Sequence, residues 1–94
     1  MAIVTKFNNP VAIDAGRKIA EYFKKRNVQV FSVNNIDHPD VILISPQKIR
    51  NLDLDLVFAV GGDGTTLRTF RMVPKMTPIF SINIGGIVGT PWST

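Results

Sequence analysis

The chain has 94 residues and so has room for one domain, and its 45% hydrophobic and 19% charged residues are ordinary for a globular protein. It has no cysteine and a single histidine, which excludes disulfides, thiolate metal sites and histidine-rich metal sites. The net charge of +4 comes from basic residues without the interleaved aromatic residues that stack on nucleic-acid bases. No apolar run is long enough to span a membrane, and no targeting segment is visible. We therefore expect a cytoplasmic protein that binds neither nucleic acid nor membrane.

The first elements predicted are a short strand and a long amphipathic helix. Residues 2–7 are apolar β-formers, Asn9 can cap a helix, and Pro10 suits the first helical position. Apolar residues then recur at helical spacing until Asn27 ends the pattern, and the basic residues fall on the solvent side. We expect these to form a solvated face: Arg17, Lys18, Lys24, Lys25 and Arg26.

The remaining elements predict a mostly parallel sheet. Residues 28–33, 41–44, 56–60 and 78–83 are predicted strands, the last three buried, while Pro46 can open a short helix and residues 67–73 form another that Pro74 ends. His38 falls in a loop, where we expect it to be solvated and without a role. The order predicts a single Rossmann-like α/β domain over residues 1–94, in three layers, with about 4–5 strands and helices on the faces of the sheet.

A glycine-rich loop follows the predicted strand 56–60 and precedes a helix. Ligands of open parallel sheets bind beyond the carboxyl ends of the strands, and a helix N-terminus offers free N–H groups and a positive dipole end to a phosphate. Glycine permits positive φ and leaves no Cβ in the way of a phosphate, while threonine can cap the helix or donate its hydroxyl. The residues predicted to bind phosphate are Gly61, Gly62, Gly64 and Thr65, with Thr66 beside them.

Asp63 lies inside this loop, where its charge would repel a phosphate unless the carboxylate has another task. It can accept the proton of an attacking hydroxyl as a general base in phosphoryl transfer, or it can help to hold a magnesium ion that bridges the phosphates. Aspartate is also common in turns without any catalytic role. The strand before and the helix after the loop favour a functional role.

Two other nucleotide-binding motifs do not occur. No lysine follows Gly64, so the loop is not a Walker P-loop. Residues 8–10 after the first strand read Asn-Asn-Pro in place of the dinucleotide-binding glycine fingerprint. A hydride-transferring Rossmann enzyme is therefore disfavoured.

Segment 60–68 (VGGDGTTLR) resembles the signature loop of NAD kinases, which diacylglycerol kinases, sphingosine kinases and phosphofructokinases share in looser form. Segment 78–89 (PIFSINIGGIVG) is similar to the second NAD kinase segment, in which a proline-led strand runs into Gly-x-Asn-x-Gly-x-x-Gly. Asn83, Gly85 and Gly89 match that pattern, whereas lipid kinases have a Gly-Thr-Gly-Asn-Asp-like sequence there. The two segments together favour the NAD kinase family.

The resemblance implies a phosphofructokinase-like fold and transfer of a phosphoryl group from ATP, or polyphosphate in some members, to the 2′-hydroxyl of the adenosine ribose of NAD, with magnesium or another divalent cation. Asp63 would be the base that faces this hydroxyl, and Asn83 would lie near the nucleotide. Arg68 is a candidate phosphate contact, with an exposed helix arginine as the alternative. The glycines of the loop and Thr65 would meet the phosphates, no side chains are assigned to a protein-held metal, and the full-length protein would form homo-oligomers.

The chain also departs from the family pattern. Ser81 replaces a glycine, and Thr90 replaces a phenylalanine that would be a bulky apolar anchor. NAD kinases carry a C-terminal β-rich domain that grips NAD, so we expect this chain to be the N-terminal domain alone and inactive by itself. The alternatives are a lipid or sugar kinase domain that shares the loop, a nucleotide-binding module without chemistry and, last, a nucleic-acid binder.

Overall fold

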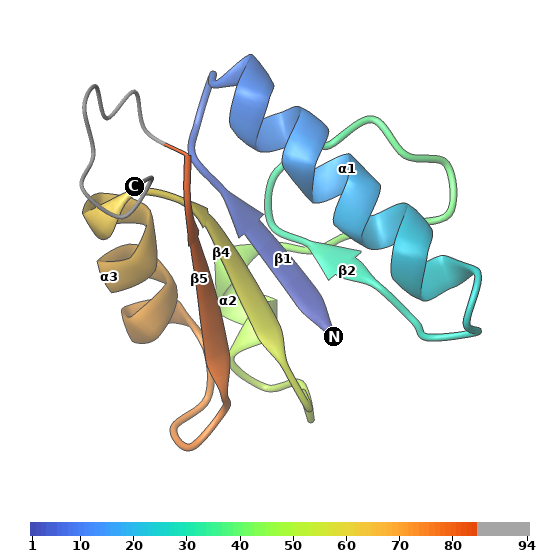
Figure 1. Ribbon diagram of the computed structural model, residues 1–94. Helices are drawn as coiled ribbons and strands as arrows, with labels where there is room; N and C mark the ends of the chain where they lie inside the picture. The colour runs from blue at the N-terminus through green and yellow to red at the C-terminus, as the bar shows by residue number, and fades with distance from the viewer. Residues whose placement is uncertain (85–94) are drawn as a thin grey trace.

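The computed structural model of the protein describes residues 1–84, and the residues Gly85, Gly89 and Thr90 named above lie outside them. In the described residues five parallel strands form one sheet in the order β3-β2-β1-β4-β5 (Figure 1). The strands are β1 (Ala2–Thr5), β2 (Phe31–Ser32), β3 (Ile42–Leu43), β4 (Val57–Gly61) and β5 (Ile79–Asn83). The helices are α1 (Pro10–Lys24), α2 (Pro46–Ile49) and α3 (Asp63–Met72). The predicted α/β class is confirmed.

The sheet is covered on both faces because successive side chains of a strand point to opposite sides. On one face Ile3 and Val60 pack in one buried cluster with Ala12 and Ala20 of α1. On the other face a second cluster joins β1 and β4 to α2 and α3; its buried members are Ala2, Val4, Ile49, Leu54, Val57, Met72 and Val73. These two cores make the three predicted layers.

Local capping signals set the ends of the helices. The Asn9 side chain accepts a hydrogen bond of 2.9 Å from the N–H of Ala12, and Pro10 takes the first position of α1. Asn27 has a φ of 63°, in the left-handed region that asparagine tolerates after a helix. Pro46 opens α2 after the cap residue Ser45, as predicted. α3 begins at Asp63, four residues before the predicted start, because Gly62 is its extended N-cap.

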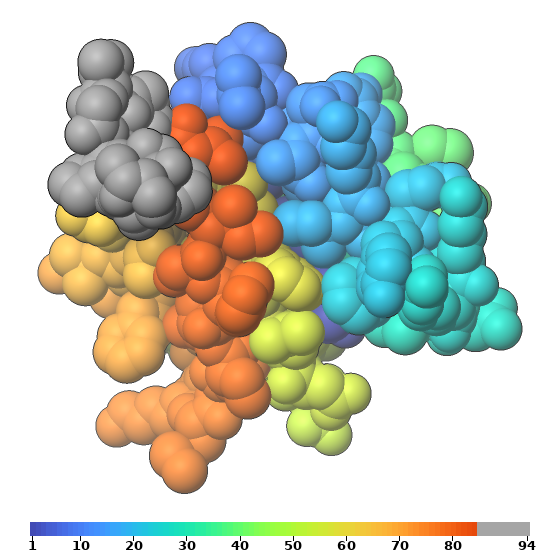
Figure 2. All heavy atoms as spheres, in the orientation of Figure 1, coloured from blue at the N-terminus to red at the C-terminus, as the bar shows by residue number. Residues whose placement is uncertain are grey.

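The outer strands differ from the prediction that they are buried on both faces. Ile42 and Leu43 of β3 are 45% and 62% exposed, because β3 lies at one edge of the sheet. β5 lies at the other edge, where Phe80 is 59% exposed although its ring packs edge-on against Phe58, with centroids 5.6 Å apart. Figure 2 shows the atoms of β5 facing the viewer beside those of α1, which does not cover them.

Candidate active site

The order of the strands reverses between β1 and β4. The chain leaves β1 through α1 toward β2, and it leaves β4 through α3 toward β5 on the other side (Figure 1). The two carboxyl ends lie together: Thr5 is opposite Val60, and the N–H of Lys6 donates to the Val60 carbonyl at 2.9 Å. Such a reversal opens a crevice in which α/β sheets bind ligands.

The glycine loop begins at this crevice. A Cβ on Gly61 would lie 2.9 Å from the Cβ of Thr65 and 3.0 Å from that of Lys6, so this position has no room for a side chain. Among the described residues, no atom lies within 4 Å of the position that a Cβ on Gly62 or Gly64 would take. None of the three glycines takes a positive φ, so the prediction that the loop uses glycine for a turn with positive φ is wrong. Gly61 permits close packing, while Gly62 and Gly64 leave open space in front of the helix.

The N-terminus of α3 carries Asp63 as its first residue, with an exposed side chain. The N-cap Gly62 offers no side-chain hydrogen bond, so N–H groups of the first turn stay available to a ligand. The prediction that threonine caps the helix is wrong. Thr65 is buried with its side chain against Gly61, and its carbonyl accepts from the Thr69 hydroxyl at 2.7 Å.

Arg68 reaches back from α3 to the end of β1. Its Nη2 donates to the Thr5 carbonyl at 2.9 Å, and its guanidinium lies 4.7 Å from the centroid of the Phe7 ring. Among the described residues its buried Nε has no hydrogen-bond partner. The alternative of an exposed helix arginine is therefore wrong, because the side chain crosses to the crevice between β1 and β4.

The end of β5 brings Asn83 to the loop. Asn83 is opposite Gly61 in the strand register, and the N–H of Ile84 donates to the Gly61 carbonyl at 2.8 Å. Ser81, which stands in place of the family glycine, lies beside the Thr66 hydroxyl, and the two oxygens are 3.0 Å apart. The serine thus adds a bond between β5 and α3 where glycine would have none.

A hollow of about 290 Å³ adjoins the crevice at the carboxyl ends of β1, β2 and β3. It is lined by Thr5, Lys6, Phe7, Asn8, Ile13, Val33, Asn34, Asn35 and Leu43, so Asp63 lies outside it. The prediction from sequence missed Lys6, Asn8 and Asn34. Asn34 fixes the hollow, since its buried side chain accepts from the Thr5 N–H at 3.1 Å. These polar residues come soon after β1 and β2 in the sequence, and this pattern could have indicated a hollow at the ends of the two strands.

His38 lies away from this site and is not solvated as predicted. Its side chain is 7% exposed, and its Nε2 is 2.8 Å from Oε1 of Glu21 on α1. The N–H of Asp40 donates to its Nδ1 at 3.1 Å, so the neutral ring carries its proton on Nε2. The bond to His38 lowers the pKa of Glu21 below its ordinary value.

The described residues show neither a metal-binding cluster of side chains nor a membrane-spanning helix. Residues 1–84 contain no group of three histidine, aspartate or glutamate side chains that could hold a metal ion. They also contain no helix with the length and hydropathy needed to cross a membrane.

Comparison with known proteins identifies the family. The family model of the ATP-NAD kinase N-terminal domain matches residues 1–89. The chain belongs to this family. Among proteins named NAD kinase, it is 35% identical to that of Syntrophobacter fumaroxidans over 88 residues and 28% identical to that of Methanothermobacter thermautotrophicus over 89 residues, with 93% of the chain covered in both. No solved structure gave a significant match.

The match is confined to one part of the relatives. The NAD kinase of Bdellovibrio bacteriovorus is 30% identical over 93 residues, and the match covers 29% of its length. The matches to the Syntrophobacter and Methanothermobacter proteins each cover 31%. This ATP-NAD kinase N-terminal domain therefore spans about a third of the length of these curated relatives.

Proposed function

We propose that this domain supplies the phosphate-binding loop and the general base for transfer of a phosphoryl group from ATP, or polyphosphate, to the 2′-hydroxyl of the adenosine ribose of NAD, giving NADP. The observation that carries the proposal is the exposed carboxylate of Asp63, the first residue of α3. This carboxylate lies where the strand order reverses between β1 and β4, in a chain that belongs to the ATP-NAD kinase N-terminal family. By itself the 94-residue chain is inactive, because NAD is gripped by a further β-rich domain.

The roles follow from the positions of the side chains. Asp63 takes the proton of the ribose hydroxyl as that oxygen attacks the terminal phosphorus, while the bond from this phosphorus to its bridging oxygen breaks and releases ADP or the shortened polyphosphate. No free alkoxide has to form in advance. The open space in front of Gly62 and Gly64 admits the phosphates to the N–H groups of the first turn, which stabilise negative charge. Arg68 neutralises a phosphate at the end of β1, and Asn83 contacts the nucleotide.

Further partners complete the proposal. Magnesium or another divalent cation enters with the phosphates. NAD is the acceptor. The complete protein works in the cytoplasm as a homo-oligomer and binds neither nucleic acid nor membrane.

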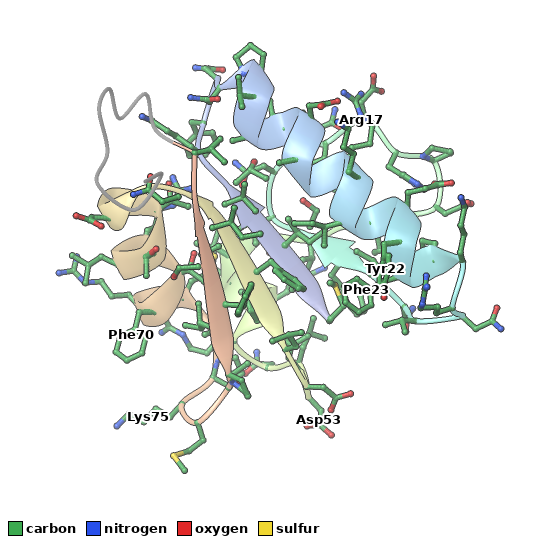
Figure 3. The ribbon with its side chains drawn as sticks, in the orientation of Figure 1. Arg17, Tyr22, Phe23, Asp53, Phe70 and Lys75 are labelled. Atoms are coloured by element: carbon green, nitrogen blue, oxygen red, sulfur yellow. The ribbon has the colours of Figure 1, made fainter. Side chains whose placement is uncertain are left out.

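The test uses a chimera, because the domain spans only part of its relatives. Residues 1–89 replace the matching part of the Syntrophobacter fumaroxidans protein, and NADP formation is measured with and without the substitution D63N. We expect D63N to lower kcat by about 100-fold or more, the usual contribution of a general base. The matched control is D53N, since Figure 3 shows Asp53 at the opposite end of β4 from the loop. Unchanged turnover in D63N would refute the catalytic assignment.

Two alternatives remain distinguishable. A lipid or sugar kinase would phosphorylate diacylglycerol or fructose 6-phosphate in preference to NAD, so the chimera is assayed with all three acceptors. A module without chemistry would bind nucleotide in the 94-residue chain and transfer nothing in the chimera. Calorimetry with ATP and with NAD at millimolar concentration measures binding. If neither ligand bound, the proposal that the glycine loop binds a nucleotide would be refuted.

A further inference from the structure

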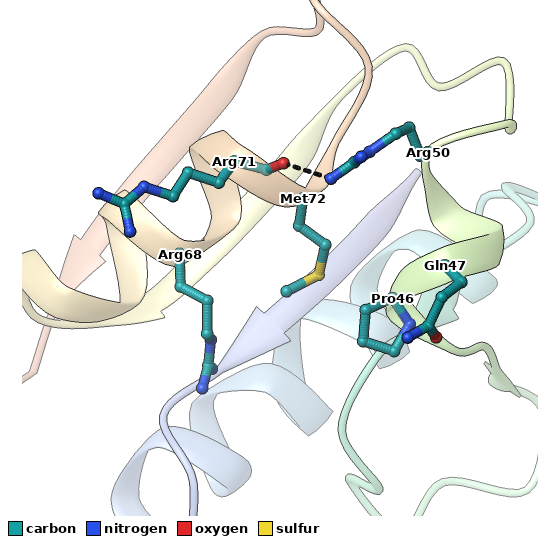
Figure 4. A pocket seen from close by; sticks show the side chains of 6 residues that line it. All are labelled: Pro46, Gln47, Arg50, Arg68, Arg71 and Met72. Carbon is teal, nitrogen blue, oxygen red and sulfur yellow. Dashed lines mark hydrogen bonds between the residues drawn. The ribbon is translucent and has the colours of Figure 1, made fainter.

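A second cavity, between α2 and α3, is lined by arginines. Its volume is about 370 Å³, within the range of small-molecule pockets. The six residues that line it are Pro46, Gln47, Arg50, Arg68, Arg71 and Met72 (Figure 4). The lining therefore carries three positive charges and no carboxylate, and Asp63 is not part of it.

The cations are positioned by both helices. Arg68 and Arg71 are three residues apart and occupy neighbouring positions on the surface of α3; Figure 4 shows the Arg68 side chain running toward the end of β1 and the Arg71 side chain running in another direction. Arg50, directly after α2, reaches across the gap and its Nη2 donates to the Arg71 carbonyl at 2.8 Å. Met72 is buried and forms the apolar floor. The cavity thus has a fixed floor and a charged rim drawn from two helices.

These charges are not neutralised within the described chain. In residues 1–84 the ion pairs involve the cations Arg17, Lys18 and His38, and no carboxylate lies within 4 Å of the guanidinium groups of the cavity. Each guanidinium carries five N–H donors and stays charged, and the Arg50 bond described above uses a single one. The buried Nε of Arg68 adds a donor that has no partner in the same part of the chain. An anion would relieve the mutual repulsion and use the free donors.

We propose that the α2–α3 cavity binds a small anion with a phosphate chain of at least two phosphoryl groups. Planar guanidinium groups match the oxygens of phosphates in pairs, and several arginines around one cavity suit a ligand with several charges. The cavity shares Arg68 with the candidate active site, but its lining does not include the glycine loop or Asp63. Arg71 lies eight residues beyond Asp63, which is about 12 Å along a helix.

The direct test is calorimetry of the 94-residue chain with inorganic pyrophosphate. The substitution R71Q should weaken binding about tenfold, the loss expected for one charge-assisted interaction. The Arg71 side chain is exposed and only its carbonyl meets Arg50, so R71Q should leave the circular dichroism spectrum unchanged. The matched control is R17Q on α1, on the opposite face of the sheet, which removes the same charge and should leave the affinity unchanged.

Two results would overturn the proposal. One is an R71Q protein that binds pyrophosphate as tightly as the wild type, and the other is an equal loss in R17Q, which would mean attraction to net charge alone. D63N should leave the Arg71-dependent affinity intact, so failure of the catalytic proposal and failure of this one are told apart. ADP replaces pyrophosphate in a second titration: an equal sensitivity to R71Q assigns the cavity to a nucleotide, and sensitivity with pyrophosphate alone assigns it to a free phosphate chain.

Discussion

The glycines of the loop can be separated by substituting alanine at Gly61 and at Gly64. At Gly61 the new Cβ would lie 2.9 Å from Thr65 Cβ and 3.0 Å from Lys6 Cβ, closer than packed carbons approach. Overpacking of this kind costs about 1–3 kcal/mol. For a domain of this size we expect the Tm of G61A to fall by at least about 4 °C.

Gly64 should respond in the opposite direction. It is the second residue of α3, and an added Cβ would meet no atom of residues 1–84 within 4 Å. Alanine is favoured over glycine in a helix by roughly 0.5–1 kcal/mol, because glycine loses more backbone entropy on folding. G64A should therefore raise Tm by about 2–8 °C, while its methyl group occupies the space in which we propose that a phosphate binds.

Two assays on the same proteins check both effects. Thermal unfolding followed by circular dichroism gives the change in stability, and calorimetric titration with ATP gives the affinity. We expect G64A to be more stable than the wild type and to bind ATP more weakly, and G61A to be less stable. A G61A protein as stable as the wild type would refute the packing reasoning, and unimpaired ATP binding by G64A would refute the proposed place of the phosphate.

Two further predictions concern the supports of the crevice and of the loop before β3. N34A leaves the buried Thr5 N–H without its acceptor and should lower the free energy of unfolding by about 1–3 kcal/mol, measured by urea denaturation; an unchanged midpoint would contradict it. The bond to His38 lowers the pKa of Glu21 in the folded protein. The Glu21–His38 bond therefore stabilises the fold fully above the ordinary glutamate pKa, and this stabilisation is lost as pH falls through the lowered pKa. E21Q should therefore show a smaller fall in Tm than the wild type between about pH 5 and pH 3, and parallel curves would exclude this pair as a source of acid sensitivity.

The parts of the fold that were predicted from sequence depend on neighbouring residues. Asn9 and Pro10 define the start of α1 within a few residues, and the apolar run before Gly61 defines β4. Whether a strand is central or at an edge depends on pairing with distant residues. The apolar run that contains Ile42 and Leu43 therefore reads like a buried strand, although both side chains are exposed.

The same distinction holds for the candidate site. The positions of Asp63 and the glycines follow from the loop between β4 and α3, which is a local pattern. The contact of Arg68 with the Thr5 carbonyl spans 63 residues, and no periodicity indicates it. The role of Asn34 has the same origin, since its partner is Thr5 on another strand. Side chains that link strands far apart in the chain need the strand order, which the residues alone did not supply.

The pairing of β1 with β4 also has a consequence for folding. Ala2 pairs with Val57 and Thr5 with Val60, so β1 receives one of its two neighbours from a strand that follows it by 55 residues in the chain. Contacts between segments so distant in sequence form slowly because a long loop must close first. The part that contains β1, β2 and β3 can assemble early, and the β4–α3–β5 unit then docks through the backbone hydrogen bonds between β1 and β4 and through both buried clusters. We expect the candidate active site, which lies where β1 meets β4, to be among the last features to appear.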